Sequence, residues 1–293
     1  MTVNEIFRLQ DADEYSAAEN IYLSAANEKR SAVVLAASRC AGLEAVTADR
    51  PKVMLPVAAK PLLRHLVEAF KKEGINDITV VGGYRADAIE KGGIRLVVNE
   101  KHESTGELAS LACAAAHLNG DAVISYGDLL FRSYILRDLV ESDSDFCVVV
   151  DSSQAPQAGE SVTDFAYCST ADDRALFGQK VWLEKVVGAG QPLDEGRAPQ
   201  GRWMGLINVR AGARERLLAT LAELGKRPDF DRLDMAALLN ALLAAGQKIE
   251  VHYVHGHWRG VNDLDDFRRA GDFAHGQSPI GSEGAQDTEH ARD

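Results

Sequence analysis

A loop rich in small and basic residues follows the apolar segment 31–37, which has the composition of a strand buried on both faces. Its cations are Arg39, Arg50 and Lys52, and its small residues include Ser38, Ala41 and Gly42. Small residues let backbone N–H groups approach a phosphate, whose charge nearby cations can then neutralise. The loop therefore indicates a phosphate-binding site.

A carboxylate stands at the end of another apolar segment, 121–128. Asp128 follows a glycine there, a position where carboxylates hold Mg²⁺ that bridges nucleotide phosphates. The alternative is that Asp128 caps the next helix. A later strand-like segment, "KIEVHYVH", is followed by His257, Trp258 and Asn262. In open α/β sheets ligands bind at the carboxyl ends of strands, so we expect these groups to meet the loop.

Strands and helices alternate in the first half of the chain. The expected strands are 31–37, 78–83, 94–99, 121–128 and 145–153, with helices from Pro61 and over 107–118. This order predicts βαβ units, and hence an α/β fold with a Rossmann-like, mostly parallel mixed sheet flanked by helices.

After residue 160 the pattern changes. The segments "TDFAYCST", "KVWLEKVV" and "WMGLINVR" predict strands in antiparallel pairs at an edge of the sheet. We expect two further helices, over 211–224 and 231–245, and a last helix from Asp263. The expected division is an amphipathic helical arm over 1–30, one domain over 31–275 and a disordered tail over 276–293.

Composition narrows the class of protein. The chain has 293 residues, and 44 acidic against 32 basic residues give a net charge of −12. A protein so acidic is not expected to bind nucleic acid or anionic membranes through a general basic surface. The four cysteines have no metal-binding spacing, and no apolar run is long enough to span a membrane. These features predict a cytoplasmic protein with reduced thiols.

The stretch "VVLAASRCAGLEAVTADRPKVMLPVAAKPLL" resembles the signature of the sugar-phosphate nucleotidyltransferase superfamily: an apolar strand, a G-x-G-x-R-like loop, R-P-K, L-P-V and G-K-P. The resemblance continues through "SYGDLLF", "GRWMGLINV" and "HWRGVNDLDDF", over roughly residues 31–273. It is closest to the phosphonate cytidylyltransferase domains that occur fused behind phosphoenolpyruvate mutase. "NEIFRLQ" near the N-terminus is similar to the end of such a mutase. A fused or associated mutase is therefore an implied partner, and a homodimer stays open.

The resemblance implies roles for individual residues. It gives Lys52, helped by Arg39 and Arg50, the catalytic role, and makes Asp128 and Asn262 ligands of Mg²⁺. The implied nucleotide-binding residues are Leu35, Ala36, Ala37, Ser38, Gly42, Thr105, Gly106, Glu107 and Ser110. The implied acceptor-binding residues are Lys185, Arg202, Trp203, His257 and Trp258.

The loop departs from the superfamily pattern, because Ser38 and Cys40 replace its two glycines and Gly42 replaces its arginine. Arg39 or Arg50 is then expected to hold the triphosphate. The implied reaction is transfer of CMP from CTP to 2-hydroxyethylphosphonate or 2-aminoethylphosphonate, with release of pyrophosphate. The alternatives are a phosphocholine cytidylyltransferase, a sugar-1-phosphate nucleotidyltransferase and a catalytically inactive nucleotide-binding module.

Overall fold

The computed structural model of the chain describes residues 30–39, 42–153, 164–173, 178–188 and 191–275. The tail expected over 276–293 lies outside the described residues, as does the arm expected over 1–30, apart from residue 30. Within the described residues, no helix is long and apolar enough to cross a membrane.

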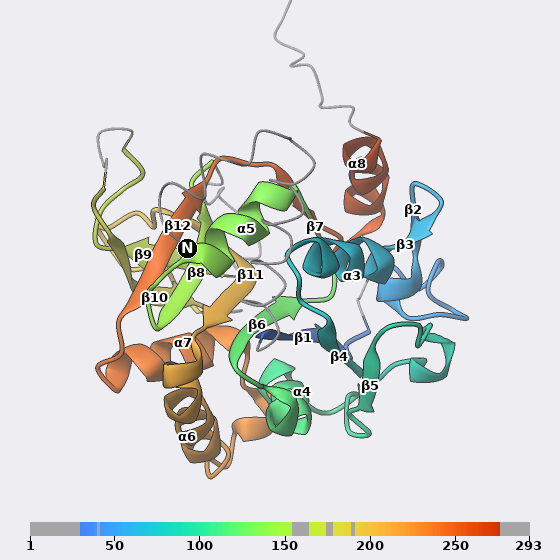
Figure 1. The fold of residues 1–293 in the computed structure, drawn as a ribbon, viewed down its shortest axis with the longest axis horizontal. Coiled ribbons are helices and arrows are strands. Elements are labelled where there is room, and N and C mark those ends of the chain that lie inside the picture. Colours follow the sequence, from blue (N-terminus) through green and yellow to red (C-terminus); the bar gives the residue numbers. More distant parts are fainter. Residues whose placement is uncertain (1–29, 40–41, 154–163, 174–177, 189–190, 276–293) are drawn as a thin grey trace, which may run out of the picture.

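A nine-stranded mixed sheet forms the centre of the protein (Figure 1). In spatial order its strands are β5 (Arg95–Val98), β4 (Asp77–Gly82), β1 (Arg30–Ala36), β6 (Asp121–Tyr126), β11 (Gly201–Val209), β8 (Phe146–Asp151), β12 (Ile249–Val254), β10 (Val181–Val187) and β9 (Phe165–Cys168). Parallel pairing joins β5, β4, β1 and β6, and also β8 and β12. The predicted α/β fold with a mixed sheet is confirmed.

Helices cover both faces of the sheet. Their bounds are α3 (Leu62–Lys72), α4 (Glu107–Ala114), α5 (Ser133–Glu141), α6 (Arg214–Leu224), α7 (Met235–Ala244) and α8 (Leu264–Ala274). One face packs against α4, α6 and α7, and the other packs against α3 and α5. In β1, Val33 and Leu35 join the first cluster, whereas Ala32 and Val34 join the second. Burial on both faces explains why this strand is continuously apolar.

The position of strand β11 differs from the predicted place at the edge of the sheet. The three strands after residue 160 are antiparallel to their neighbours as predicted, and β9 and β10 do lie at the edge. However, β11 is inserted between β6 and β8, antiparallel to both. Nearly all of its residues are buried, because it carries apolar side chains on both faces. Its mostly apolar composition over 203–209 is the signal that distinguishes such a central strand from an edge strand.

Two small sheets hold loops against the main sheet. β2 (Pro56–Val57) pairs with β3 (Lys60–Pro61), and β7 (Leu129–Phe131) pairs antiparallel with β13 (Trp258–Gly260). A separate apolar cluster, which includes Leu43, Leu55, Leu130 and Val261, packs beneath α8. The chain segments after β1, after β6 and before α8 are thereby fixed relative to one another, although they are far apart in sequence.

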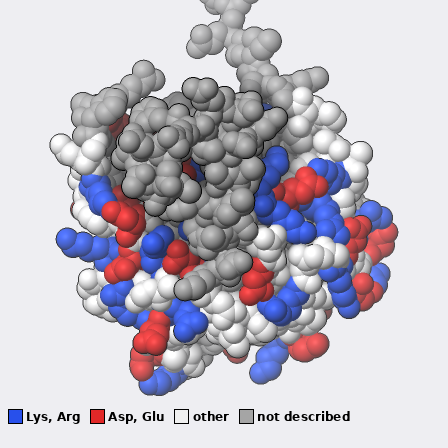
Figure 2. Space-filling model, viewed as in Figure 1, with Lys and Arg blue, Asp and Glu red and all other residues white. Residues whose placement is uncertain are grey.

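Basic and acidic side chains are interspersed over the described surface in Figure 2. Exposed ion pairs such as Lys60–Glu68 and Arg216–Asp145 account for part of this arrangement. On the face shown, the charges of the described residues therefore largely offset one another locally.

Gly205 lies at an irregularity in β11 and has a φ of +88°. A Cβ atom there would stand 2.2 Å from Cδ2 of Tyr126, whose ring packs against Trp203 at a centroid distance of 5.4 Å. We predict that Gly205→Ala lowers the free energy of unfolding by about 2–4 kcal/mol, because left-handed strain and overpacking add. Chemical denaturation measures this loss.

Gly246→Ala is the matched control. Gly246 has a φ of +79°, but nothing lies within 4 Å of the position its Cβ would take. This variant should lose only about 1–2 kcal/mol, from the backbone alone. Equal losses in the two variants would show that contact with Tyr126 contributes nothing.

Candidate active site

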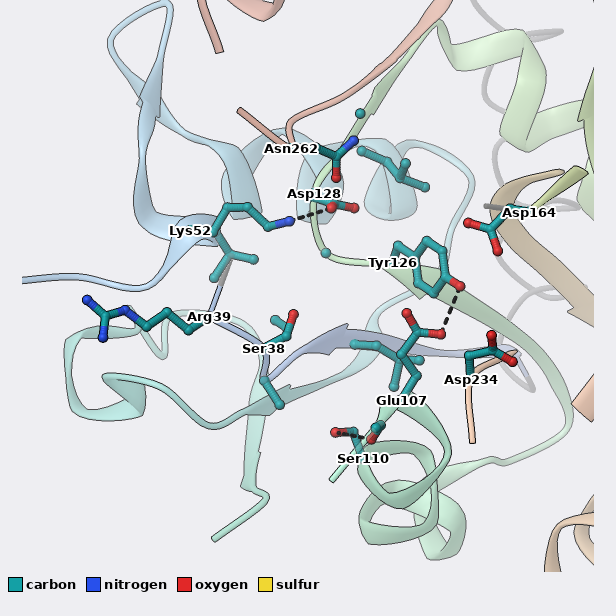
Figure 3. A pocket seen from close by; sticks show the side chains of 18 of the residues that line it. Ser38, Arg39, Lys52, Glu107, Ser110, Tyr126, Asp128, Asp164, Asp234 and Asn262 are labelled. Carbon is teal, nitrogen blue, oxygen red and sulfur yellow. Dashed lines mark hydrogen bonds and ion pairs between the residues drawn. The ribbon is translucent and has the colours of Figure 1, made fainter. Parts of the chain in front are cut away.

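A cavity of about 780 Å³ opens where β1 and β6 end (Figure 3). Its other walls come from the 3₁₀ helix η1 (Lys52–Met54), His102 in the loop after β5, the start of α4, the turn before β7, Asp164 ahead of β9, strand β11, the start of α7, and the segment around β13. The position agrees with the expectation that the ligand site lies at the carboxyl ends of the strands.

Lys52 and Asp128 form an ion pair in this cavity. Nζ of Lys52 lies 2.5 Å from Oδ2 of Asp128, and the two side chains are only 11% and 17% exposed. The turn that carries Asp128 is fixed to β1, because the N–H of Gly127 donates to the carbonyl of Leu35 over 2.8 Å. A side chain at position 127 would meet that carbonyl at 2.9 Å, so glycine permits the close approach. Asp128 is followed by β7, not by a helix that it could cap.

Asn262 lies beside Asp128 in Figure 3. The pairing of β7 with β13 brings it there, and the N–H of Val261 donates to the carbonyl of Asp128 over 3.0 Å. The carboxylate and amide oxygens of Asp128 and Asn262 are hard donors of the type that Mg²⁺ takes. The ammonium group of Lys52 already contacts the carboxylate, so the position suits a cation. The donor set fits the expected metal.

The expected nucleotide-binding residues lie mostly around the cavity. Leu35, Ala36, Ala37, Ser38, Thr105, Gly106, Glu107 and Ser110 line it, and Gly42 does not. Sequence reasoning missed Asn99, whose Nδ2 donates to Oγ1 of Thr105 at 2.9 Å and to Oγ of Ser110 at 3.0 Å. This buried amide fixes the start of α4 against the end of β5. An isolated asparagine gives no sequence signal for this role.

The expected cations divide into two groups. Arg39 and Arg202 line the cavity with Lys52. Arg39 lies 4.7 Å from the centre of the Tyr84 ring, and its guanidinium points away from the other labelled side chains in Figure 3. Outside the lining, Arg50 is paired with Asp49 at 2.9 Å and Lys185 with Asp194 at 2.5 Å.

Of the expected acceptor-binding aromatic residues, two line the cavity and one does not. Trp203 and Trp258 line the cavity, and Nε1 of Trp258 donates to Oδ2 of the buried Asp151 over 2.6 Å. His257 lies outside the lining, with its Nδ1 2.9 Å from the hydroxyl of Tyr134. Among the described residues, Nε of Arg202 is buried without a hydrogen-bond partner.

Three carboxylates on the side of the cavity away from Arg39 form what we call the acidic cluster: Glu107, Asp164 and Asp234 (Figure 3). Oε2 of Glu107 accepts from the hydroxyl of Tyr126 and from the N–H of Met235, both over 2.9 Å. Oδ1 of Asp234 accepts from the N–H of Ala237 over 2.9 Å and so caps α7. Sequence reasoning did not identify Asp164 or Asp234.

Burial perturbs the acidic cluster. It raises the pKa of Glu107, against the opposing effect of the Met235 N–H. Burial, with the negative charge of Glu107, raises the pKa of Asp164 to about 7, and Arg202 only partly opposes this. A site with uncompensated negative charge of this kind is typical of functional positions.

Cys147, Glu250 and His252 form a second group of potential metal ligands, with ligand atoms within 4.8 Å of one another. Glu250 already accepts from Ser142 at 2.6 Å and faces Lys180 at 3.5 Å. Burial raises the pKa of Cys147 to about 12, so the group that a metal would need as a thiolate is a thiol. The bonded carboxylate and the protonated thiol make this group a poorer metal site than Asp128 and Asn262.

The sequence profile of the MobA-like NTP transferase domain matches residues 32–228. Among curated proteins, the CTP:phosphoglutamine cytidylyltransferase of Campylobacter jejuni is 22% identical over 80% of this chain and 96% of its own length. The CMP-5'-(3-aminopropyl)phosphonate synthase of Streptomyces rubellomurinus is 28% identical over 82% of this chain, but the match spans only 38% of that protein.

Solved structures share the fold. The CTP:phosphocholine cytidylyltransferase of Streptococcus pneumoniae has a TM-score of 0.65 at 20% identity, covering 84% of this chain and 99% of its own. An inositol-1-phosphate CTP transferase from T. maritima has a TM-score of 0.62 at 16% identity, covering 86% and 98%. The fold is therefore that of the nucleotidyltransferases.

The raised pKa of Asp164 predicts how stability depends on pH. Between pH about 4 and 7 the folded state keeps a proton that the unfolded chain has released, so the free energy of unfolding falls as pH rises. Asp164→Asn removes this titration, and asparagine tolerates the φ of 63° at this position. Relative to the parent, the variant should gain roughly 1–4 kcal/mol between pH 4 and 8.

The groups that act on the Asp164 carboxylate are Glu107, Asp234, Asp128 and Arg202, and all keep their identity in this variant. Urea denaturation at a series of pH values measures the gain. Asp145→Asn, at an exposed residue paired with Arg216, is the control and should show no such trend. A constant difference between Asp164→Asn and the parent at all pH values would contradict the assignment.

Proposed function

This chain belongs to the family of MobA-like NTP transferase domains, and from that membership we propose that it is a cytidylyltransferase that transfers CMP from CTP to a small phosphonate. The observation that carries the proposal is the convergence of Lys52, Asp128 and Asn262 in one cavity. The named activities of the phosphoglutamine and aminopropylphosphonate relatives support CTP as donor. The phosphonate acceptor rests on the second relative and on the resemblance in sequence.

In the proposed reaction an oxygen of the phosphonate attacks the α-phosphorus of CTP. The bond between the α-phosphorus and the oxygen that bridges to the β-phosphate breaks, and pyrophosphate leaves with that oxygen. A phosphonate is already ionised at neutral pH, so the protein needs no general base. The work of the chain is to position the two anions and to neutralise their charge.

Lys52 is the residue best placed to bring the two anions together. Its ammonium group is a compact charge on a flexible stem, so it can leave Asp128 and contact oxygens of the α-phosphate and the phosphonate. Asp128 and Asn262 would hold Mg²⁺, which supplies positive charge to the phosphate oxygens. Backbone groups after β1, together with the start of α4, are available to hold the nucleotide.

The alternative acceptors are phosphocholine and a sugar 1-phosphate. Similarity to the Streptococcus pneumoniae choline-phosphate cytidylyltransferase, 34% identical over 38% of this chain and 50% of its own length, favours the first of these. An inactive nucleotide-binding module would not require Lys52 and Asp128 to remain paired in the cavity. Pyrophosphate release from each of the four NTPs, with each type of acceptor, distinguishes these functions.

We predict that Lys52→Ala slows the chemical step by about 10²–10³-fold, the usual effect of removing one charge that acts on the transition state. Binding of CTP with Mg²⁺ should persist, because Asp128, Asn262 and the backbone after β1 remain to hold it. Single-turnover kinetics give the rate of the chemical step, and calorimetry gives the affinity.

The control is Lys226→Ala, which removes an exposed lysine paired with Glu223 and should leave both quantities unchanged. Lys52→Arg should restore the rate only in part, since a planar fork does not replace a point charge between two phosphorus centres. A Lys52→Ala enzyme that reacts at the parent rate would contradict the proposed role of this residue.

A further inference from the structure

The start of α4 is held against the segment that leads into α7. The N–H of Gly106 donates to the carbonyl of Asp231 over 2.6 Å. In the other direction, the N–H of Met235 donates to Oε2 of Glu107 over 2.9 Å. These bonds cross between the two segments, so Glu107 lies in a fixed part of the cavity wall.

The two carboxylate oxygens of Glu107 have different surroundings. Oε2 accepts from the hydroxyl of Tyr126 and from the N–H of Met235, both over 2.9 Å. Among the residues that the structure describes, no hydrogen bond reaches Oε1, which is turned toward the interior of the cavity in Figure 3. The carboxylate therefore presents one oriented oxygen to a ligand.

A purely structural role does not require a charged group at this position. A glutamine side chain could accept from both Met235 and Tyr126 with its carbonyl oxygen. Burial in the cavity wall disfavours the ionised carboxylate and raises the pKa of Glu107. The second oxygen is the acceptor that a carboxylate has and an amide lacks, so we expect it to have a partner of its own.

A pyrimidine base carries the groups that such an oxygen distinguishes. Cytosine has an exocyclic amino group, which donates, where uracil has a carbonyl oxygen, which accepts. An ionised carboxylate only accepts, so it pairs with the amino group of cytosine. Ser110 lies on the same face of α4 and also lines the cavity, but a hydroxyl can donate to N3 of cytosine or accept from N3–H of uracil. Of these two side chains, Glu107 is the one that discriminates between the bases.

The other two carboxylates of the acidic cluster lie elsewhere in the cavity. Asp234 belongs to the start of α7, which it caps through Oδ1. Asp164 lies on the side of Tyr126 away from Ser38 in Figure 3. Within the cluster, Glu107 is the member on α4, the helix whose first residues line the cavity together with the backbone after β1.

We propose that Glu107 determines the choice of nucleotide, because its Oε1 accepts a hydrogen bond from the amino group of cytosine and so selects CTP over UTP. The inference rests on the proposed function, which places the phosphates beside Lys52 and the rest of the nucleotide along the backbone after β1 and the start of α4. ATP carries a similar amino group on a larger base. UTP, which matches CTP in size, is therefore the informative comparison.

The test is calorimetric binding of CTP and of UTP to the full chain at pH 8, each with Mg²⁺ and without an acceptor. We expect CTP to bind about 10–100-fold more tightly, the range for one hydrogen bond to a charged group. Equal affinities, or tighter binding of UTP, would overturn the proposal. A chain that binds neither nucleotide would overturn it as well.

Glu107→Gln separates a role in reading the base from a structural role. The N–H of Met235 belongs to the main chain and only donates, so the amide oxygen must face it and the amide nitrogen must face the cavity. The variant should therefore bind UTP about tenfold more tightly than CTP. Damage to the cavity wall would instead weaken both nucleotides and keep their order. A variant that prefers CTP as strongly as the parent does would contradict the proposal.

Two further variants complete the series. Glu107→Ala removes the group that discriminates and should bind CTP and UTP with equal affinity. Glu103→Gln changes an exposed carboxylate outside the cavity lining and should keep the preference of the parent. A preference for CTP that survives in Glu107→Ala would assign the choice of base to other residues.

Turnover distinguishes failure of this inference from failure of the proposed function. If CTP binds selectively through Glu107 but reacts with no acceptor, the proposed transfer fails and the assignment of Glu107 stands. If CTP and UTP react with the same phosphonate at equal kcat/KM, nucleotidyl transfer stands and the assignment of Glu107 fails.

Discussion

The ion pair between Lys52 and Asp128 is the contact on which the candidate site depends. It joins residues 76 positions apart, from the loop after β1 and the turn after β6. Both groups are largely removed from water, and leaving either one unpaired costs about 3–5 kcal/mol. The carboxylate therefore needs a cation at every stage. Mg²⁺ held by Asp128 and Asn262 would supply that cation, and Lys52 would then be able to contact phosphate oxygens, so the same contact would position the charge that the proposed reaction uses.

Hydrogen bonds also hold the other charged groups of the cavity in place. Main-chain hydrogen bonds to Leu35 and Asp128 fix the side that carries the Lys52–Asp128 ion pair, whereas Tyr126, Met235 and Ala237 fix Glu107 and Asp234. Main-chain hydrogen bonds to Val187 and Trp203 fix the backbone of Asp164, whereas its carboxylate makes no hydrogen bond to the other described residues.

Much of the fold follows from local patterns. Continuous apolar runs predicted β1, β4, β6 and β8, and the motif around Lys52 led to residues that meet at the ends of β1 and β6. The insertion of β11 in the centre of the sheet was not predicted, because pairing partners are chosen by packing across the whole sheet. The acidic cluster was missed for the same reason: Glu107, Asp164 and Asp234 are distant in sequence and meet only through β11 and α7. Arg50 is paired with Asp49 and Lys185 with Asp194, and both cations lie outside the cavity lining. The sequence motifs do not show that these acidic neighbours, and not a phosphate, are the partners of the two cations.

The most direct test of the central claim is phosphorus NMR of the parent protein with CTP, Mg²⁺ and 2-aminoethylphosphonate. Nucleotidyl transfer predicts a phosphonate resonance that shifts and becomes coupled to a new α-phosphate signal, with one equivalent of pyrophosphate formed per product. CTP that stays intact, or that yields CMP and pyrophosphate with the phosphonate resonance unchanged, would contradict the account.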